Sequence, residues 1–142
     1  MKAYRGIAQV IAALVVLQAA FIAYALFRVQ GELDDGKQVP KDGNIGQGLH
    51  SIGAMVVAVL AIALLVTALV TKLEGAARRA GMVLGAVVLQ FVLAFIGFSA
   101  AVVGALHGIN AFVVLGAALY ASRLGVGSVG GQLPGARAAS AG

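Results

Sequence analysis

The sequence contains no cysteine and no tryptophan, only 2 prolines, and charged residues at just 11% of its 142 positions. Without cysteine the chain has no disulfide framework, no thiolate metal ligand and no cysteine nucleophile. A soluble domain carries about 25% charged residues, so the polar residues here are too few to cover a globule in water. The composition therefore excludes an ordinary soluble domain and indicates a protein whose solvent is largely lipid.

The charge distribution and the missing motifs exclude further functional classes. Ten Lys and Arg against five Asp and Glu give a net charge of +5, but the basic residues are spread over segment ends, which argues against nucleic-acid binding. The sequence has no phosphate-binding loop and no serine nucleophile elbow. No Asp or Glu lies inside a long apolar stretch, which argues against a carboxylate proton relay. Any chemistry would then belong to a cofactor, and no catalytic residue is assigned.

Four long apolar stretches without a charged residue dominate the chain. As helices rising 1.5 Å per residue, each is about as long as a hydrocarbon core of about 30 Å is thick. They are too long, and alternate too little, for the strands of a membrane β-barrel. The sequence therefore predicts an all-α integral membrane four-helix bundle within residues 1–122. The predicted helices are residues 7–27, 49–70, 82–98 and 102–121, with an outer loop over 31–48, a tight hairpin at 99–101 and a flexible cytoplasmic tail over 123–142.

The basic residues predict the orientation of this bundle. With the N-terminus inside, seven Lys and Arg lie on the inner side and three on the outer side, which favours both termini in the cytoplasm of a cell with an inner (plasma) membrane. An alternative interpretation takes the first stretch as a signal peptide, because the triplet Ala23-Tyr24-Ala25 resembles a cleavage site. Cleavage there would keep the orientation of the other helices but remove one wall of the bundle.

An internal repeat is the strongest signal in the sequence. The tetrapeptide that ends at Gln18 recurs as the tetrapeptide that ends at Gln90, and residues 49–57 match residues 106–114 at six of nine positions. Matches anchored on rare residues such as Gln and His, in the same order, are not expected from chance among Val, Leu and Ala. The sequence therefore predicts two parallel helical-hairpin repeats, related by a pseudo-two-fold axis along the membrane normal.

The repeat draws attention to His50 and His107, the only two histidines in the chain. The predicted axis places them at the same depth, near the outer ends of the second and fourth helices. Two histidines on facing helices of an apolar bundle can hold a haem iron from both sides as axial ligands. In the alternative interpretation each histidine bonds a backbone carbonyl or lies at the membrane interface, and ties helices together without a cofactor.

Small and amide residues around the histidines are candidates for the same site. Gly53, Gly104 and Gly108 would cut back the helix surface to admit a flat macrocycle. Gln18 and Gln90 lie near the middle of their helices, where they are expected to bond each other across the axis or to line the floor of a cofactor pocket. A direct bond from glutamine to histidine is the less favoured alternative, because each glutamine is counted several Å deeper than its histidine.

Cations on the outer side are candidates for binding haem propionates. Arg28 is the first candidate, because it ends the first helix on the side of the histidines, followed by Lys37 and Lys41 in the outer loop. The alternative for Arg28 is an interfacial anchor. The four carboxylates of the outer loop do not have the spacing of a calcium-binding loop.

The order of these motifs resembles a known group of proteins. The chain resembles a family of small bacterial four-span membrane proteins of unassigned function. Four motifs in this order carry the resemblance: VVLQ at Gln18, LHxxG at His50 to Gly53, VVLQ at Gln90 and LHxxNA at His107 to Asn110. More distantly, the chain is similar to one half of haem A synthase, which is built from two four-helix bundles that each carry a histidine pair for haem. This resemblance implies haem ligands at His50 and His107. Oxygenase activity is not implied, because no motif aligns Glu32 with that enzyme's acidic catalytic residue.

The sequence therefore predicts a membrane protein that binds one b-type haem between His50 and His107, with Asn110 among the cofactor-binding residues. Electron transfer or haem handling is the predicted role, with the lipid bilayer and a redox partner or larger membrane complex as partners, and self-association left open. The alternative from another class is a cofactor-free scaffold or assembly subunit of a larger complex. A channel formed by an oligomer is a third and weaker hypothesis.

Overall fold

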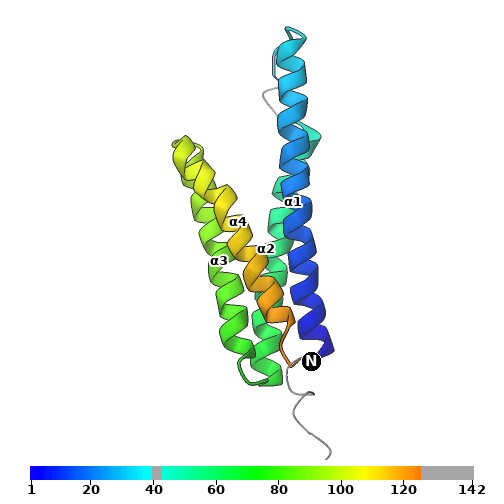
Figure 1. The fold of residues 1–142 in the computed structure, drawn as a ribbon, viewed down its shortest axis with the longest axis vertical. Helices are drawn as coiled ribbons and strands as arrows, with labels where there is room; N and C mark the ends of the chain where they lie inside the picture. Colours follow the sequence, from blue (N-terminus) through cyan, green and yellow to red (C-terminus); the bar gives the residue numbers. More distant parts are fainter. Residues whose placement is uncertain (40–42, 126–142) are drawn as a thin grey trace, which may run out of the picture.

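The computed structural model describes residues 1–39 and 43–125. Within these residues the chain forms four α-helices and no strand: α1 (Lys2–Asp34), α2 (Ile45–Thr71), α3 (Ala76–Gly97) and α4 (Ala101–Ser122) (Figure 1). All four helices are long and apolar enough to cross a membrane. The prediction of an all-α, multi-pass membrane protein is confirmed. Most of the predicted tail, residues 126–142, lies outside the described residues.

The first helix continues well beyond its apolar stretch. The stretch ends at Phe27, but α1 runs to Asp34 because polar side chains one turn apart bond each other along its last two turns. Arg28 pairs with Glu32 at 3.3 Å, and the Gln30 amide donates to Asp34 at 2.8 Å. Residues 31–34, predicted as loop, are therefore helical.

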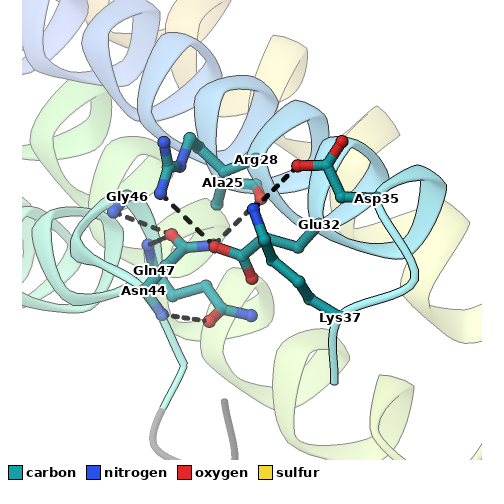
Figure 2. A network of polar contacts seen from close by, with 8 residues as sticks. All are labelled: Ala25, Arg28, Glu32, Asp35, Lys37, Asn44, Gly46 and Gln47. Atoms are coloured by element: carbon teal, nitrogen blue, oxygen red, sulfur yellow. Dashed lines mark hydrogen bonds and ion pairs between the residues drawn. The ribbon is translucent and has the colours of Figure 1, made fainter. Parts of the chain in front are cut away.

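The second helix begins earlier than predicted because its first turn carries a complete capping box. The Asn44 side chain accepts hydrogen bonds from the backbone of Gly46 and Gln47, and the Gln47 side chain accepts from the Asn44 backbone (Figure 2). Asn44 also donates to the Ala25 carbonyl at 3.0 Å, which fastens the start of α2 to α1. The predicted outer loop 31–48 is thus shortened at both ends, because residues 31–34 and 45–48 are helical.

The hairpin between α3 and α4 is as tight as the sequence predicts. Only residues 98–100 connect the two helices. Just inside the turn, a Cβ on Gly97 would lie 2.9 Å from the Cα of Gly104, so the two backbones approach more closely than any larger residue would allow.

The packing has small residues inside and large apolar residues outside. α1 and α3 each contact both α2 and α4, so α2 and α4 lie diagonally opposite each other. Alanine is the commonest residue of the buried core, whereas Phe95 is 80% exposed and Phe98 is 90% exposed. Lipid tails are as apolar as these side chains, so the large residues face lipid while small ones let the helices pack closely. The eight core alanines with the lowest exposure are Ala8, Ala25, Ala61, Ala68, Ala76, Ala80, Ala118 and Ala121.

The two hairpins are fastened at one end of the molecule and diverge at the other. We call the end with residue 1, residues 72–75 and residues 123–125 the base, and the opposite end, with residues 35–39 and 98–100, the loop end. At the base the Tyr4 hydroxyl of α1 donates to the Ala76 carbonyl of α3 at 3.1 Å, and Arg5 Nε of α1 donates to the Ser122 carbonyl of α4 at 3.1 Å. Figure 1 shows the α1–α2 and α3–α4 hairpins close together at the base and spread apart at the loop end.

Candidate functional site

Two histidines from diagonal helices meet between the hairpins. His50 lies on α2 and His107 on α4, each within two turns of the start of its helix. Their ring centroids are 6.2 Å apart, with an angle of 68° between the ring planes. Because α2 and α4 do not pack directly against each other, the rings reach across the middle of the bundle. The structure therefore brings the two predicted ligands together.

One nitrogen of each imidazole is held by a glutamine carbonyl of the same hairpin. His50 Nδ1 lies 3.1 Å from the Gln18 carbonyl oxygen, and His107 Nδ1 lies 3.0 Å from the Gln90 carbonyl oxygen. A carbonyl can only accept, so Nδ1 is the donor in both rings, and in the tautomer with a single proton Nε2 carries a lone pair that can accept a hydrogen bond or bind a metal ion. A backbone carbonyl on Nδ1 is the usual way in which proteins orient a histidine that binds a metal through Nε2.

The Nε2 atom of His107 is already hydrogen-bonded, and this corrects one prediction. The Gln90 amide nitrogen lies 3.2 Å from His107 Nε2 and donates to the His107 carbonyl at 2.9 Å. Asn110, only 5% exposed, fixes the amide by donating to Gln90 Oε1 at 2.6 Å and to the Ala86 carbonyl at 2.9 Å. A direct glutamine–histidine bond was the less favoured alternative, but Gln90 lies seven residues before the end of α3 and His107 six after the start of α4, which places them at nearly the same depth.

The side chain of Gln18 behaves differently from that of Gln90. Gln18 is 8% exposed, and neither its amide nitrogen nor its amide oxygen has a hydrogen-bond partner within the described residues. The amide lies over Gly53, where any Cβ would overlap it. The expected bond between Gln18 and Gln90 is therefore not formed. The Gln90 amide instead makes its hydrogen bonds to His107 and Asn110 of α4. Gly53 makes room for Gln18 and does not line either cavity described below.

Two apolar cavities border the histidine pair. One has a volume of 330 Å³ and lies on the base side, among residues such as Val57 and Val114. The other has a volume of 530 Å³ and extends towards the loop end, past Gly97 and Gly104. His50, His107 and Gln90 line both. Volumes of this size are typical of small-molecule and cofactor sites.

Several lining residues were not singled out by the sequence analysis. Ile22 and Phe91 line both cavities, as does Ala54, and Ala111 lines the first. Ile22 and Phe91 carry no signal, because apolar residues are everywhere in this chain. Ala54 and Ala111 carry one: each follows its histidine by four residues, one helical turn along the same face.

The remaining predicted site residues are distributed unevenly around the cavities. Gly108 lines the smaller cavity and Gly104 the larger one. Arg28 pairs with Glu32, and Lys37 pairs with Asp35 at 2.8 Å in the network of Figure 2. Neither cation lines a cavity, so the structure does not bring them to the histidines. Lys41 lies outside the described residues.

The donor set restricts which metal species the site could hold. Among residues 1–39 and 43–125 no group of three or more His, Cys, Asp or Glu side chains is placed to bind a metal ion. A protein-bound zinc ion takes at least three protein ligands, so the histidine pair alone does not make such a site. A haem brings its own ring nitrogens, and needs the protein only for axial ligands.

Comparison of the chain with protein-family models, with curated proteins and with solved structures finds no match.

Proposed function

We propose that this protein binds one b-type haem with His50 and His107 as axial ligands, and serves electron transfer or haem handling in the membrane. The observation that carries the proposal is the meeting of two imidazoles, from diagonal helices, at the border of two apolar cavities. Both rings have their Nδ1 proton bonded to a backbone carbonyl, so that Nε2 is the ligating atom. The haem would supply one-electron chemistry, which the side chains of this chain do not supply.

The spacing and the volume around the rings are compatible with this role. Two imidazole nitrogens on opposite sides of one metal ion are about 4 Å apart, since each metal–nitrogen bond is about 2 Å long. The ring centroids of His50 and His107 are 6.2 Å apart, which is compatible with that spacing. The Gln90 amide has to release His107 Nε2 before that atom can bind iron.

The repeat and the orientation belong to the same proposal. The two hairpins make the same contact at corresponding residues, histidine Nδ1 to glutamine carbonyl, which supports a pair of parallel repeats. Among the described residues, six Lys and Arg lie near the base and two near the loop end. Those near the base are Lys2, Arg5, Lys72, Arg78, Arg79 and Arg123, and those near the loop end are Arg28 and Lys37. This asymmetry supports a base in the cytoplasm and a histidine pair towards the outer face of the inner membrane.

The visible spectrum of the purified protein tests the proposal. The full chain is produced in haem-replete cells, extracted in mild detergent and examined for the absorption bands of a low-spin, six-coordinate haem. His50→Ala and His107→Ala are each expected to lose the low-spin bands, whereas Gln18→Ala keeps them. A colourless protein that takes up no added haem, or a low-spin spectrum that survives in both histidine variants, would refute the ligand assignment.

A cofactor-free scaffold is the second candidate, and one observation favours it. The His107–Gln90–Asn110 network satisfies its hydrogen bonds without any ligand, as expected of histidines that tie helices together. In that case His107→Gln stays folded and the protein co-purifies with a larger membrane complex. The haem hypothesis instead predicts that this variant loses the low-spin spectrum whether or not a complex is present.

A further inference from the structure

The two histidines differ in what holds Nε2, and this difference points to a property of the site. Resting on the proposed function, we infer that His50 is the permanent iron ligand and that Gln90 competes with iron for His107. The position of His107 on the iron is therefore exchangeable, and a small external ligand such as imidazole or carbon monoxide can take it. A site of this kind suits haem exchange better than fixed electron transfer.

The competition at His107 follows from the roles of the atoms around it. His107 Nδ1 donates to the Gln90 carbonyl, so Nε2 is an acceptor and receives the Gln90 amide N–H at 3.2 Å. The same lone pair would bind iron, so the two interactions exclude each other. Asn110 holds the amide in place through Gln90 Oε1 at 2.6 Å, which makes the bond to His107 the resting arrangement.

No such competitor is present at His50. Within the described residues His50 makes one hydrogen bond, from Nδ1 to the Gln18 carbonyl, and none from Nε2. The Gln18 amide lies over Gly53 instead. Gly53 stands at the repeat position that Asn110 occupies in the second hairpin, and it has no side chain with which to orient Gln18. His50 Nε2 is therefore free to bind at once.

The apolar surroundings identify the external ligand by its chemistry. The cavity of 530 Å³ reaches both rings and is lined by Ala94, Phe98 and Gly104, among others. A small uncharged molecule with one lone pair can enter such a space without leaving a charge in it. Imidazole and carbon monoxide are suitable probes, because both are small, uncharged and bind haem iron through one atom.

A matched pair of leucine variants tests the competition. Gln90→Leu removes the competitor, and Gln18→Leu makes the same change in the hairpin where the amide makes no hydrogen bond to a ring nitrogen within the described residues. The full-length variants are purified in detergent, their helical content is checked, and haemin is titrated into each. Gln90→Leu is expected to bind haemin about fivefold more tightly than the wild type, which corresponds to a net hydrogen bond of about 1 kcal/mol, and to bind imidazole or carbon monoxide correspondingly more weakly. In Gln18→Leu no hydrogen bond to a ring nitrogen is lost, so its haemin and imidazole affinities are expected to change less than those of Gln90→Leu. Equal haemin and imidazole affinities in Gln90→Leu and Gln18→Leu would overturn the inference.

The two histidine variants give a second, independent readout. In His107→Ala the remaining ligand is His50, whose Nε2 has no competing hydrogen bond. In His50→Ala the remaining ligand is His107, whose Nε2 has to break its hydrogen bond with the Gln90 amide before it binds iron. His107→Ala is therefore expected to bind haemin about fivefold more tightly than His50→Ala, with a five-coordinate spectrum that shifts on addition of imidazole. Equal affinities of these variants, with a haem-loaded wild type, would overturn the inference alone. A wild type that takes up no haemin would overturn the proposed function and the inference together.

Discussion

The two hairpins orient their histidines in the same way and differ in the residue three positions after each histidine. In both, the ring Nδ1 bonds the carbonyl of a glutamine on the preceding helix, at 3.1 Å for His50 and 3.0 Å for His107. Three residues after the histidine, the first hairpin has Gly53 and the second has Asn110. Asn110 binds the glutamine side chain and aims it at the ring, whereas Gly53 only leaves space for it.

This difference shows how a duplicated scaffold can acquire two unlike ligands. The backbone contact that orients each ring does not depend on side-chain identity, so it is the same in both hairpins. In the second hairpin the residue three positions later, Asn110, holds the glutamine amide against Nε2, whereas in the first hairpin Gly53 leaves the amide without such a partner.

The largest expected loss of stability comes from a substitution in the packing of the first hairpin, away from the histidine pair. A Cβ on Gly46 would lie 2.7 Å from the Phe21 carbonyl oxygen and 2.9 Å from the Ala25 backbone nitrogen. Backbone atoms cannot move aside as a side chain can, so Gly46→Ala is expected to destabilise the protein by about 1–3 kcal/mol. The measurement is denaturant unfolding in mixed micelles, followed by circular dichroism.

Gly48→Ala is the matched control for this variant. It changes the same helix two residues later, where nothing lies within 4 Å of the new Cβ. Alanine favours a helix over glycine by about 0.5–1 kcal/mol, so this variant is expected to be neutral or slightly more stable. Equal losses of stability in the two variants would show that the close contact between α1 and α2 does not form.

A smaller effect is expected when the second hairpin is converted towards the first. Asn110→Gly removes the bonds to Ala86 and Gln90 and places a glycine within α4. The expected loss is about 1–2 kcal/mol, from buried interhelical hydrogen bonds and from helix propensity together. In the same variant Gln90 is no longer held against His107, so haemin affinity is expected to rise towards that of Gln90→Leu. An unchanged stability would show that Asn110 does not organise the network.

The smallest effects are expected from the two glutamine variants without haem, and only Gln90→Leu is expected to lose stability. Gln90→Leu loses its bonds to His107 and is expected to destabilise the haem-free protein by about 1 kcal/mol. Gln18→Leu replaces a buried amide without a partner, so it is expected to be neutral or to stabilise by up to about 1 kcal/mol. Unfolding curves of the two haem-free variants measure both, and a loss from Gln18→Leu equal to that from Gln90→Leu would contradict the comparison.

The membrane fold could be predicted from the sequence, but the helix ends could not be placed by hydropathy alone. Four uncharged stretches were sufficient to predict four helices, because only a helix can pair all its backbone groups within lipid. Hydropathy predicts that the first helix ends at Phe27, because Arg28 is the first charged residue after the apolar stretch. In the structure, side-chain pairs such as Arg28–Glu32 extend the helix by about two turns. Capping by Asn44 likewise moved the start of α2 to Ile45.

The candidate site could be predicted in part, and the rest depended on the relative depth of the helices. The repeat identified His50 and His107, and the structure brings their rings together. The predicted depths of Gln18 and Gln90 relative to their histidines were wrong. For Gln18 the reason is that the ends of α1 and α2 do not lie at the same depth, because Gly46, in the first turn of α2, packs beside Phe21 and Ala25 of α1. A count from the helix ends therefore displaced Gln18 from His50 in the prediction, although they touch in the structure.

Titration of haemin into the purified wild-type chain, followed by its visible spectrum, tests the central claim most directly. The account predicts saturation at about one haem per chain, since the chain has a single histidine pair, with the bands of a six-coordinate, low-spin species that imidazole displaces in part. Absence of saturable binding, or a spectrum that does not change when both histidines are replaced by alanine, would contradict it.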